Sequence, residues 1–150
     1  MKKDSVIYLD VCTLSRPFDD QSFLRIRIET EAVNLILTAI RTGKCALVYS
    51  PVHINEIEAI DDRIERIELL TLLSSMGDII HSKNGAVRTR AEELVTMGFG
   101  VADAAHVAFA EKVKASFISC DDKLIKHCLK HGMQIWCGNP VAYCEKEGLK

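Results

Sequence analysis

The sequence predicts an α/β fold, a three-layer α/β/α sandwich around a central parallel sheet with Rossmann-like topology. Short apolar runs alternate with longer segments of helical periodicity, which is the pattern of βα units. The short runs contain few polar positions, as expected of parallel strands that helices cover on both faces. The chain has 150 residues, of which 48% are hydrophobic and 27% charged, so residues 1–150 are predicted to form one domain.

Three runs are predicted as strands because each is short, β-rich and followed by a polar or turn residue. They are Val6–Leu9, Ala46–Tyr49 and Phe117–Ser119. Weaker candidates are Ile79–His81 and Met133–Trp136. The carboxyl ends of parallel strands share one edge of the sheet, and ligand sites of open α/β sheets form there.

Helices are predicted between these strands from the spacing of their apolar residues. Ser50 and Pro51 indicate an N-cap and a first helical residue, and that helix should continue to about Ile60. The other predicted helices cover Phe23–Thr42, Asp62–Ser74, Asn84–Met97, Val101–Lys114 and Asp122–His131.

Charge and cysteine content restrict the function classes only slightly. The net charge of −2 gives no support for a non-specific nucleic-acid coat protein, but an acidic metal site would itself lower the net charge. Six cysteines without a Cys-x-x-Cys pair suggest reduced, mostly buried thiols in a cytoplasmic protein. No signal segment and no membrane span are expected.

Four acids occupy positions that the predicted topology can bring together. Asp10 and Asp121 each follow a strand, Asp103 lies in the first turn of a helix, and Glu56 lies within the helix after Tyr49. Oxygen-only ligands suit Mg²⁺ or Mn²⁺, which can activate water for phosphodiester cleavage. Each acid also has a structural explanation, namely helix capping for two of them and a solvated helix charge for Glu56. The prediction therefore rests on all four together.

The segments around these acids resemble the PIN-domain nuclease family, and the resemblance spans most of the chain. The similar segments, in order, are IYLDVCTL at 7–14, SPVHINEI at 50–57, GVADAAHVA at 100–108 and FISCD at 117–121. The resemblance implies a parallel sheet with flanking helices and a Mg²⁺- or Mn²⁺-dependent endoribonuclease. Asp10, Glu56, Asp103 and Asp121 would be its catalytic metal ligands. Small single-domain members are often VapC-type toxins, which implies an antitoxin partner, while amphipathic helices suggest a homodimer.

Other residues near the four acids are assigned supporting roles. Arg16 is the preferred contact for an RNA phosphate, because it closely follows the first strand. His106 lies one turn after Asp103 on the same helical face and is predicted to hold that acid or a substrate phosphate, with a buried, hydrogen-bonded histidine as the alternative. Ser119 and Asp122 are predicted to support the acids, with Asp122 alternatively an N-cap. One departure from the family is Cys12, where many members carry Asn or Ser.

Three alternatives compete with the nuclease interpretation. A phosphatase of the haloacid dehalogenase type needs a second aspartate two residues after the first, where this chain has Cys12. A phospho-accepting receiver domain needs an acidic pair near the first strand, and that pair is missing. The third alternative, a catalytically silent PIN-like module that binds RNA or protein, stays open because the sequence cannot separate it from a nuclease. The RNA target, any cleavage of DNA and the number of metal ions are likewise left open.

Overall fold

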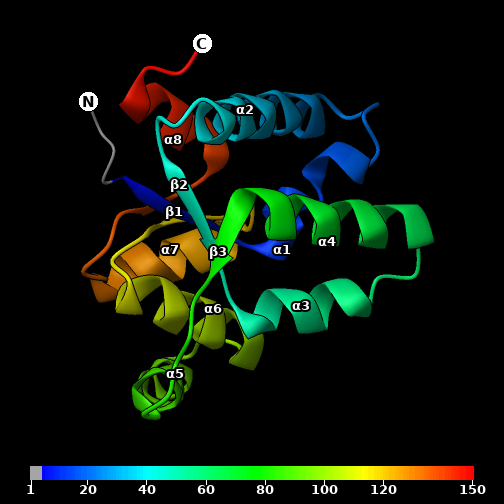
Figure 1. Ribbon diagram of the computed structural model, residues 1–150. Coiled ribbons are helices and arrows are strands. Elements are labelled where there is room, and N and C mark those ends of the chain that lie inside the picture. Colours follow the sequence, from blue (N-terminus) through cyan, green and yellow to red (C-terminus); the bar gives the residue numbers. More distant parts are fainter. Residues whose placement is uncertain (1–4) are drawn as a thin grey trace.

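A five-stranded, all-parallel sheet forms the centre of the molecule (Figure 1). The computed structural model describes residues 5–150. The strands are β1 (Val6–Leu9), β2 (Ala46–Tyr49), β3 (Gly77–Ile79), β4 (Ser116–Ile118) and β5 (Cys137–Gly138). Their spatial order is β3-β2-β1-β4-β5, so the chain builds one half of the sheet from β1 outwards and then returns to β1 to build the other half.

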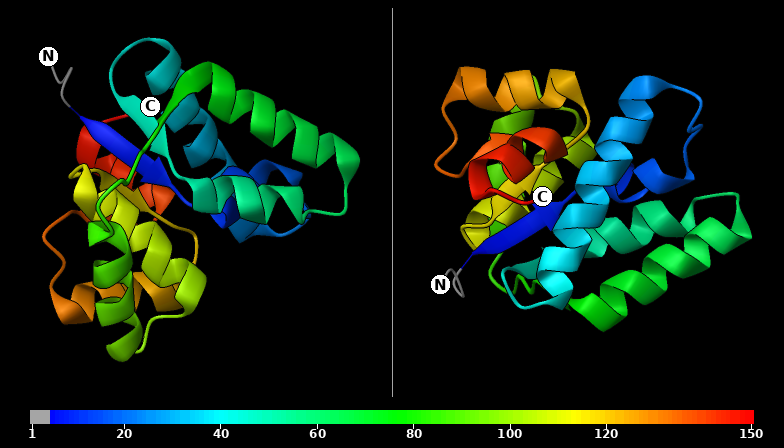
Figure 2. Two further views of the ribbon diagram at one scale, coloured as in Figure 1. Left: turned by 60° about the horizontal axis from the view of Figure 1, so that its bottom comes forward. Right: turned by 90° about the horizontal axis from the view of Figure 1, so that it is seen from above.

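Helices cover both faces of the sheet, which confirms the predicted three-layer sandwich. One side carries α1 (Val11–Leu14), the 3-10 turn η1 (Arg16–Phe18), α2 (Leu24–Arg41), α3 (Pro51–Glu58), α4 (Arg63–Met76) and α8 (Pro140–Glu147). The other side carries α5 (Ala86–Thr96), α6 (Val101–Lys112) and α7 (Asp122–His131). Figures 1 and 2 show α3 and α4 as an antiparallel hairpin that leads into β3.

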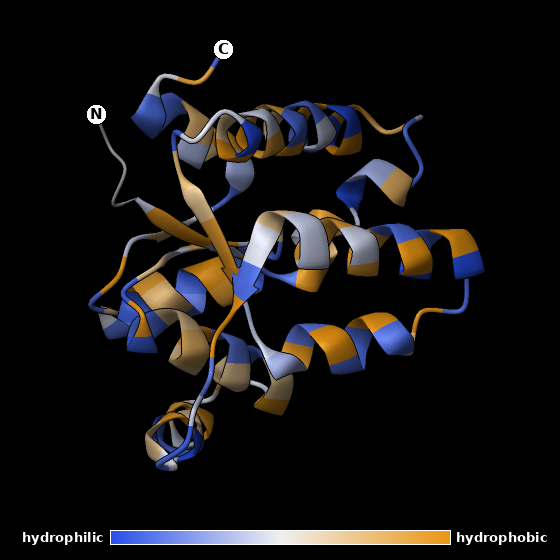
Figure 3. Cartoon of the chain, viewed as in Figure 1, coloured by the Kyte–Doolittle hydropathy of each residue, from blue (hydrophilic) through white to orange (hydrophobic). Residues whose placement is uncertain are grey.

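The two faces of the sheet bury separate apolar clusters, as the alternation of side chains along a strand requires. On β1, Ile7 and Leu9 pack with α2 and α4, while Tyr8 faces the layer of α5, α6 and α7. All three side chains are fully buried. Figure 3 shows β1 and β2 as apolar segments between more mixed helices. Unlike Ile7 and Leu9, Tyr8 carries a polar group into the buried layer, and its hydroxyl therefore needs hydrogen-bond partners.

The predicted elements largely agree with the structure, and the differences have simple causes. The strand predicted over Met133–Trp136 is wrong: β5 follows it at Cys137–Gly138, and residues 133–136 approach the sheet only through Trp136, whose carbonyl accepts from Phe117 N–H at 2.8 Å. The third strand begins two residues before the predicted Ile79–His81. The short α1 and η1 were not predicted, because one turn of helix shows no periodicity. The terminal α8 was also not predicted, and its eight residues cover little more than two turns.

The cysteines are mostly buried, as predicted. All six are free in the described residues, and five of them are buried. Within residues 5–150, no helix is long and apolar enough to cross a membrane.

Candidate metal centre

The candidate centre lies between β1 and β4, where the direction in which successive strands are added to the sheet reverses. From β1 the chain proceeds outwards through β2 and β3, and β4 and β5 then extend the other side. The carboxyl ends of β1 and β4 therefore border the switch point, where open α/β sheets place their ligand sites. Asp10 directly follows β1, and Asp121 follows β4 after Ser119 and Cys120. The sequence prediction of two strand-end acids at one edge agrees with this arrangement.

Asp10 is buried and is held by several donors from the chain. Its Oδ1 accepts from Thr13 Oγ1 at 2.6 Å and from Thr13 N–H at 3.2 Å, so Asp10 is also the N-cap of α1. Its Oδ2 accepts from Ser119 Oγ at 2.6 Å, and the Cys12 thiol donates to Oδ1 at 3.3 Å. Ser119 also accepts from Asp121 N–H at 3.0 Å. These bonds fix the Asp10 carboxylate and tie the ends of β1 and β4 together.

Glu56 is held from the other side by a buried histidine. His106 Nε2 lies 2.6 Å from Glu56 Oε1, and His106 Nδ1 lies 2.5 Å from the Tyr8 hydroxyl. Because a carboxylate only accepts, Nε2 carries the proton, and in the neutral ring Nδ1 accepts from Tyr8. The Tyr8 oxygen lies 2.8 Å from Ser50 Oγ. His106 thus holds Glu56 and not Asp103, the acid assigned to it from the sequence, and it matches the alternative of a buried, hydrogen-bonded histidine. Its contact with a substrate phosphate stays a prediction.

A second histidine fastens α3, which carries Glu56, to the end of β1. His53 Nδ1 accepts from Ser50 N–H at 3.1 Å, in the manner of a capping box. Its Nε2 must then carry the proton and donate to Leu9 O at 2.7 Å. Burial and the neighbouring His106 lower the pKa of His53 to about 3, so the ring is neutral at physiological pH. The residue before Asp10 is thereby joined to the helix of Glu56.

Asp103 and Asp121 have much less support from the chain. Asp121 is the N-cap of α7, and its carboxylate accepts a hydrogen bond from Leu124 N–H at 3.2 Å. The residue is exposed. Within residues 5–150, the Asp103 carboxylate accepts no hydrogen bond. Burial first, and then the charges of Asp121, Asp10 and Glu56, raise the pKa of Asp103, while His106 lowers it. Asp103 thus lies within the field of all three other acids.

The donor set fits a hard divalent cation. It contains four carboxylates. The chain engages both oxygens of Asp10 and one oxygen each of Glu56 and Asp121, which leaves the second oxygen of Glu56 and of Asp121 for a ligand. Among residues 5–150, no three His, Cys, Asp or Glu side chains are already close enough to form a ready-made metal site. The acids therefore share an edge without forming a closed cluster, as expected of carboxylates whose mutual repulsion is not neutralised.

Arg16 and Asp122 belong to an ion-pair network beside the acids. Arg16 lies 2.8 Å from Glu29, which is 3% exposed, and 2.9 Å from Asp19. Arg25 pairs with the same glutamate and with Asp122, at 2.7 Å. A buried carboxylate needs such compensation, so this use of Arg16 has a structural reason. Its predicted contact with an RNA phosphate stays a prediction. Asp122 is the first residue of α7, and Asp121 is the N-cap.

Sequence reasoning missed two residues that organise the acids. Thr13 is fully buried, donates to Asp10 and accepts from Cys120 N–H at 2.9 Å. An aspartate followed three residues later by threonine was an available capping signal, but the helix of four residues that it caps shows no period. Tyr8 carries no signal in the sequence, since its polar role depends on contacts with Ser50 and His106 from distant segments.

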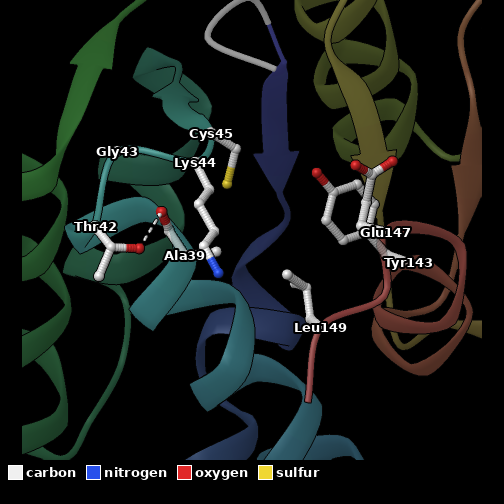
Figure 4. Close-up of a pocket in the computed structure, with 8 residues that line it drawn as sticks. All are labelled: Ala39, Thr42, Gly43, Lys44, Cys45, Tyr143, Glu147 and Leu149. Carbon is white, nitrogen blue, oxygen red and sulfur yellow. Dashed lines mark hydrogen bonds between the residues drawn. The ribbon is translucent and has the colours of Figure 1, made fainter. Parts of the chain in front are cut away.

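A separate cavity lies away from the acids. Its volume is about 260 Å³, and it is lined by α2, the loop between α2 and β2, α8 and the residues after α8 (Figure 4). The lining residues are Ala39, Thr42, Gly43, Lys44, Cys45, Tyr143, Glu147 and Leu149. Cys45 precedes β2, so this cavity lies at the amino end of that strand, whereas the acids follow the carboxyl ends. Figure 4 shows the Thr42 hydroxyl bonded to Ala39 O, at 3.3 Å, rather than aimed at the cavity.

Comparison with known proteins supports the fold. No protein-family profile matches the chain, and comparison with curated proteins gives no match. Among solved structures, the chain is similar to a chain of FitAcB from Neisseria gonorrhoeae, with 16% identity, a TM-score of 0.55 and coverage of 90% of this chain and 98% of that one. It is also similar to a chain of FitAB bound to an IR36 DNA fragment, with 17% identity, a TM-score of 0.56 and coverage of 89% and 94%. The parallel sheet, the helices on both faces and these neighbours confirm the PIN-like fold that the sequence resemblance predicts.

Proposed function

We propose that the protein is a Mg²⁺- or Mn²⁺-dependent endoribonuclease. The observation that carries this proposal is that Asp10 and Asp121 follow adjacent strands at the switch point of the sheet, where Ser119 bonds to both, while Asp103 feels the charges of Asp121, Asp10 and Glu56. Four carboxylates without a neutralising partner among themselves are a costly arrangement for stability alone, and divalent cations would remove that cost. The resemblance to PIN-domain nucleases supplies the reaction class.

Each residue of the centre has a role in this proposal. Asp10 and Glu56 are the fixed ligands, because the chain already orients their carboxylates. Asp103 and Asp121 complete the set and are free to adjust. A divalent ion bound there would supply activation of water and neutralise charge on the leaving oxygen. Products with a 5′-phosphate and a 3′-hydroxyl follow from attack by water, and no covalent intermediate with the protein is expected.

The test compares the wild type with two variants on structured and single-stranded RNA, with Mn²⁺, Mg²⁺ or EDTA. Wild-type protein should cleave only with metal, and Asp10→Asn should lose nearly all turnover because an amide replaces a charged ligand. Asp61→Asn is the matched control, since Asp61 is an exposed loop residue between α3 and α4. Cleavage that survives in EDTA or in Asp10→Asn would show that these acids are not the site.

The second candidate function is a catalytically silent module that binds RNA or protein. It is supported by the absence, in the described residues, of three acids close enough together to hold a metal ion. It predicts no cleavage of any RNA with either metal. Calorimetric titration with Mn²⁺ separates the cases when no cleavage is seen. Binding that Asp10→Asn abolishes would indicate a working metal site with a narrow target, whereas no heat of binding would support the silent module.

A toxin role, an antitoxin partner, a homodimer and a cytoplasmic location form a finer proposal, which rests on the family resemblance and the small size of the chain. Exposed apolar residues on α4 and α2, such as Ile64, Ile67 and Ile28, are consistent with surfaces that a partner covers. Growth arrest on expression that Asp10→Asn relieves would support the toxin role. Light scattering that finds only a monomer at high protein concentration would contradict the homodimer.

A further inference from the structure

Helix α7 carries a cationic face that the acid centre does not explain. Lys123, Lys126 and Lys130 are exposed and are spaced three and four residues apart, so they lie on one side of the helix. The opposite side, with Leu124 and Cys128, is buried against the sheet. We refer to these three lysines as the α7 lysine stripe. At 1.5 Å per residue, the stripe is roughly 10 Å long.

Within residues 5–150, the lysines of the stripe are unpaired, as other exposed lysines such as Lys44 and Lys112 are, but here three of them lie on one face of a single helix, whereas several arginines are neutralised by acids. Arg16 and Arg25 pair with Glu29, and Arg90 pairs with Glu93 and Glu111. Among the ion pairs of residues 5–150, none includes a lysine of the stripe. The acid on the same helix, Asp122, is itself neutralised by Arg25. Positive charge therefore accumulates along α7 although the whole chain has a net charge of −2.

Two parts of the chain connect the α7 lysine stripe to the acid centre, namely the start of α7 and the loop that precedes α6. Asp121 is the N-cap of α7, so Lys123 follows a proposed metal ligand by two residues. Along the side of the helix, His127 Nε2 donates to Met97 O at 2.9 Å, and its ring packs on Phe99 with centroids 4.6 Å apart. A Cβ on Gly98, whose φ is +100°, would lie 2.9 Å from His127 Nε2. The loop under α7 is thus held close to the helix and leads directly to Asp103.

We propose that the α7 lysine stripe binds the phosphate backbone of the RNA and guides it into the acid centre, an inference that rests on the proposed function. A centre of four carboxylates repels a polyanion, and the neighbouring cationic face supplies the attraction that an approaching strand needs. Lysine ammonium groups contact phosphate oxygens, and such contacts carry no sequence information. The stripe should therefore bind RNA without sequence preference.

The test measures binding without cleavage, so that it does not depend on catalysis. A short fluorescein-labelled single-stranded RNA is titrated in EDTA, and its fluorescence anisotropy is followed over a series of KCl concentrations. The variant K123Q/K126Q/K130Q is compared with the wild type and with K44Q/K112Q/K150Q, which removes three exposed lysines away from α7. Thermal unfolding of each variant should match that of the wild type, since all six side chains are exposed.

Loss of three phosphate contacts should reduce the slope of log K against log salt by about 2 and weaken binding about 100-fold at 0.1 M salt. The control variant should change neither by more than about twofold. Equal slopes for the stripe variant and the wild type, or equal losses in both variants, would overturn the proposal. If the stripe variant alone loses binding while the wild type never cleaves RNA with Mn²⁺, the stripe stands and the nuclease proposal fails. If the wild type cleaves RNA but the stripe variant binds RNA as the wild type does, the nuclease proposal stands and the stripe proposal fails.

Discussion

The four acids of the candidate centre divide into two that the chain holds firmly and two that it does not. Asp10 receives hydrogen bonds from Thr13, Ser119 and Cys12. Glu56 is bonded to His106, which Tyr8 positions in turn. Asp103 is instead repelled by the other three acids, and burial together with this repulsion raises its pKa. Asp121 has a capping bond only.

The difference indicates how a site can be both prepared and adaptable. The firmly held acids lie on or directly after elements that the core fixes, and buried hydroxyl and imidazole groups determine their orientation. The less supported acids begin helices, where their charge is tolerated by the free N–H groups of the first turn. A cation would therefore find two ligands in place and draw in the other two.

The largest expected effect follows from removing the Thr13 hydroxyl. Thr13→Val keeps the shape of the side chain but deletes the donor to Asp10 and the acceptor for Cys120 N–H. We expect a loss of about 2 kcal/mol in the free energy of unfolding, because a buried N–H is left unpaired. Metal affinity or turnover should fall at least about tenfold, as is usual when the support of a ligand is removed. Urea denaturation and Mn²⁺ titration measure the two effects.

Thr13→Ser separates orientation of Asp10 from packing of the methyl group. Serine retains the hydroxyl, so Mn²⁺ affinity should recover nearly to the wild-type value even if some stability is lost. Similar losses of metal affinity in the valine and serine variants would mean that the hydroxyl does not position Asp10.

A smaller effect is expected on the Glu56 side. Tyr8→Phe removes the hydroxyl between Ser50 and His106 and leaves His106 Nδ1 without its partner. We expect a loss of about 1 kcal/mol in stability and a fall in turnover of about fivefold, because Glu56 keeps its direct bond to His106. Stopped-time RNA cleavage and urea denaturation measure these changes.

Tyr143→Phe is the matched control for Tyr8→Phe. Tyr143 is 2% exposed, like Tyr8 it is a buried tyrosine, and it lines the cavity at the amino end of β2. Its loss should change stability but leave turnover as in the wild type. A comparable loss of turnover in both variants would show that general loosening of the fold, and not the position of Glu56, controls the reaction.

The same division separates what the sequence could predict from what it could not. Asp10 and Asp121 were predictable because a polar residue directly after an apolar strand has a fixed place in an α/β sheet, and periodicity located the helices of Glu56 and Asp103. The supporting groups were harder to find, since Tyr8 reads as one more apolar strand residue. Its partners Ser50 and His106 are 42 and 98 positions away in the chain.

The fold shows the same limit at its weaker elements. The apolar residues Met133–Trp136 suggested a strand, but β5 pairs only at Cys137 and Gly138, because register is set by the neighbouring β4 and not by local propensity. Likewise, Arg16 follows the first strand as a phosphate contact would, yet the buried Glu29 on α2 determines its position. Both features depend on contacts between distant parts of the chain.

The smallest expected effect concerns Asp103. Its replacement should increase the stability of the metal-free protein, whereas the substitutions at Thr13 and Tyr8 should decrease it. An acid with a raised pKa in the folded state is ionised at a cost, so the folded protein loses stability as the pH rises from the ordinary aspartate value of 3.8 through the raised pKa. The first turn of α6 favours the ionised form, but burial and three neighbouring acids outweigh it. The charge on Asp103 therefore destabilises the metal-free protein at neutral pH.

Asp103→Asn should accordingly raise the unfolding midpoint at pH 7 in EDTA, by about 2 °C, which corresponds to less than 1 kcal/mol for a domain of this size. The gain should shrink as the pH falls below the raised pKa of Asp103, because the wild-type carboxyl then becomes protonated as well. Added Mn²⁺ should reverse the order, because the wild type gains a ligand's binding energy that the asparagine variant lacks. Thermal unfolding with and without Mn²⁺ at several pH values measures all three effects. A variant less stable than the wild type in EDTA at every pH would mean that Asp103 is held by favourable contacts, and that the division between firmly and loosely held acids does not exist.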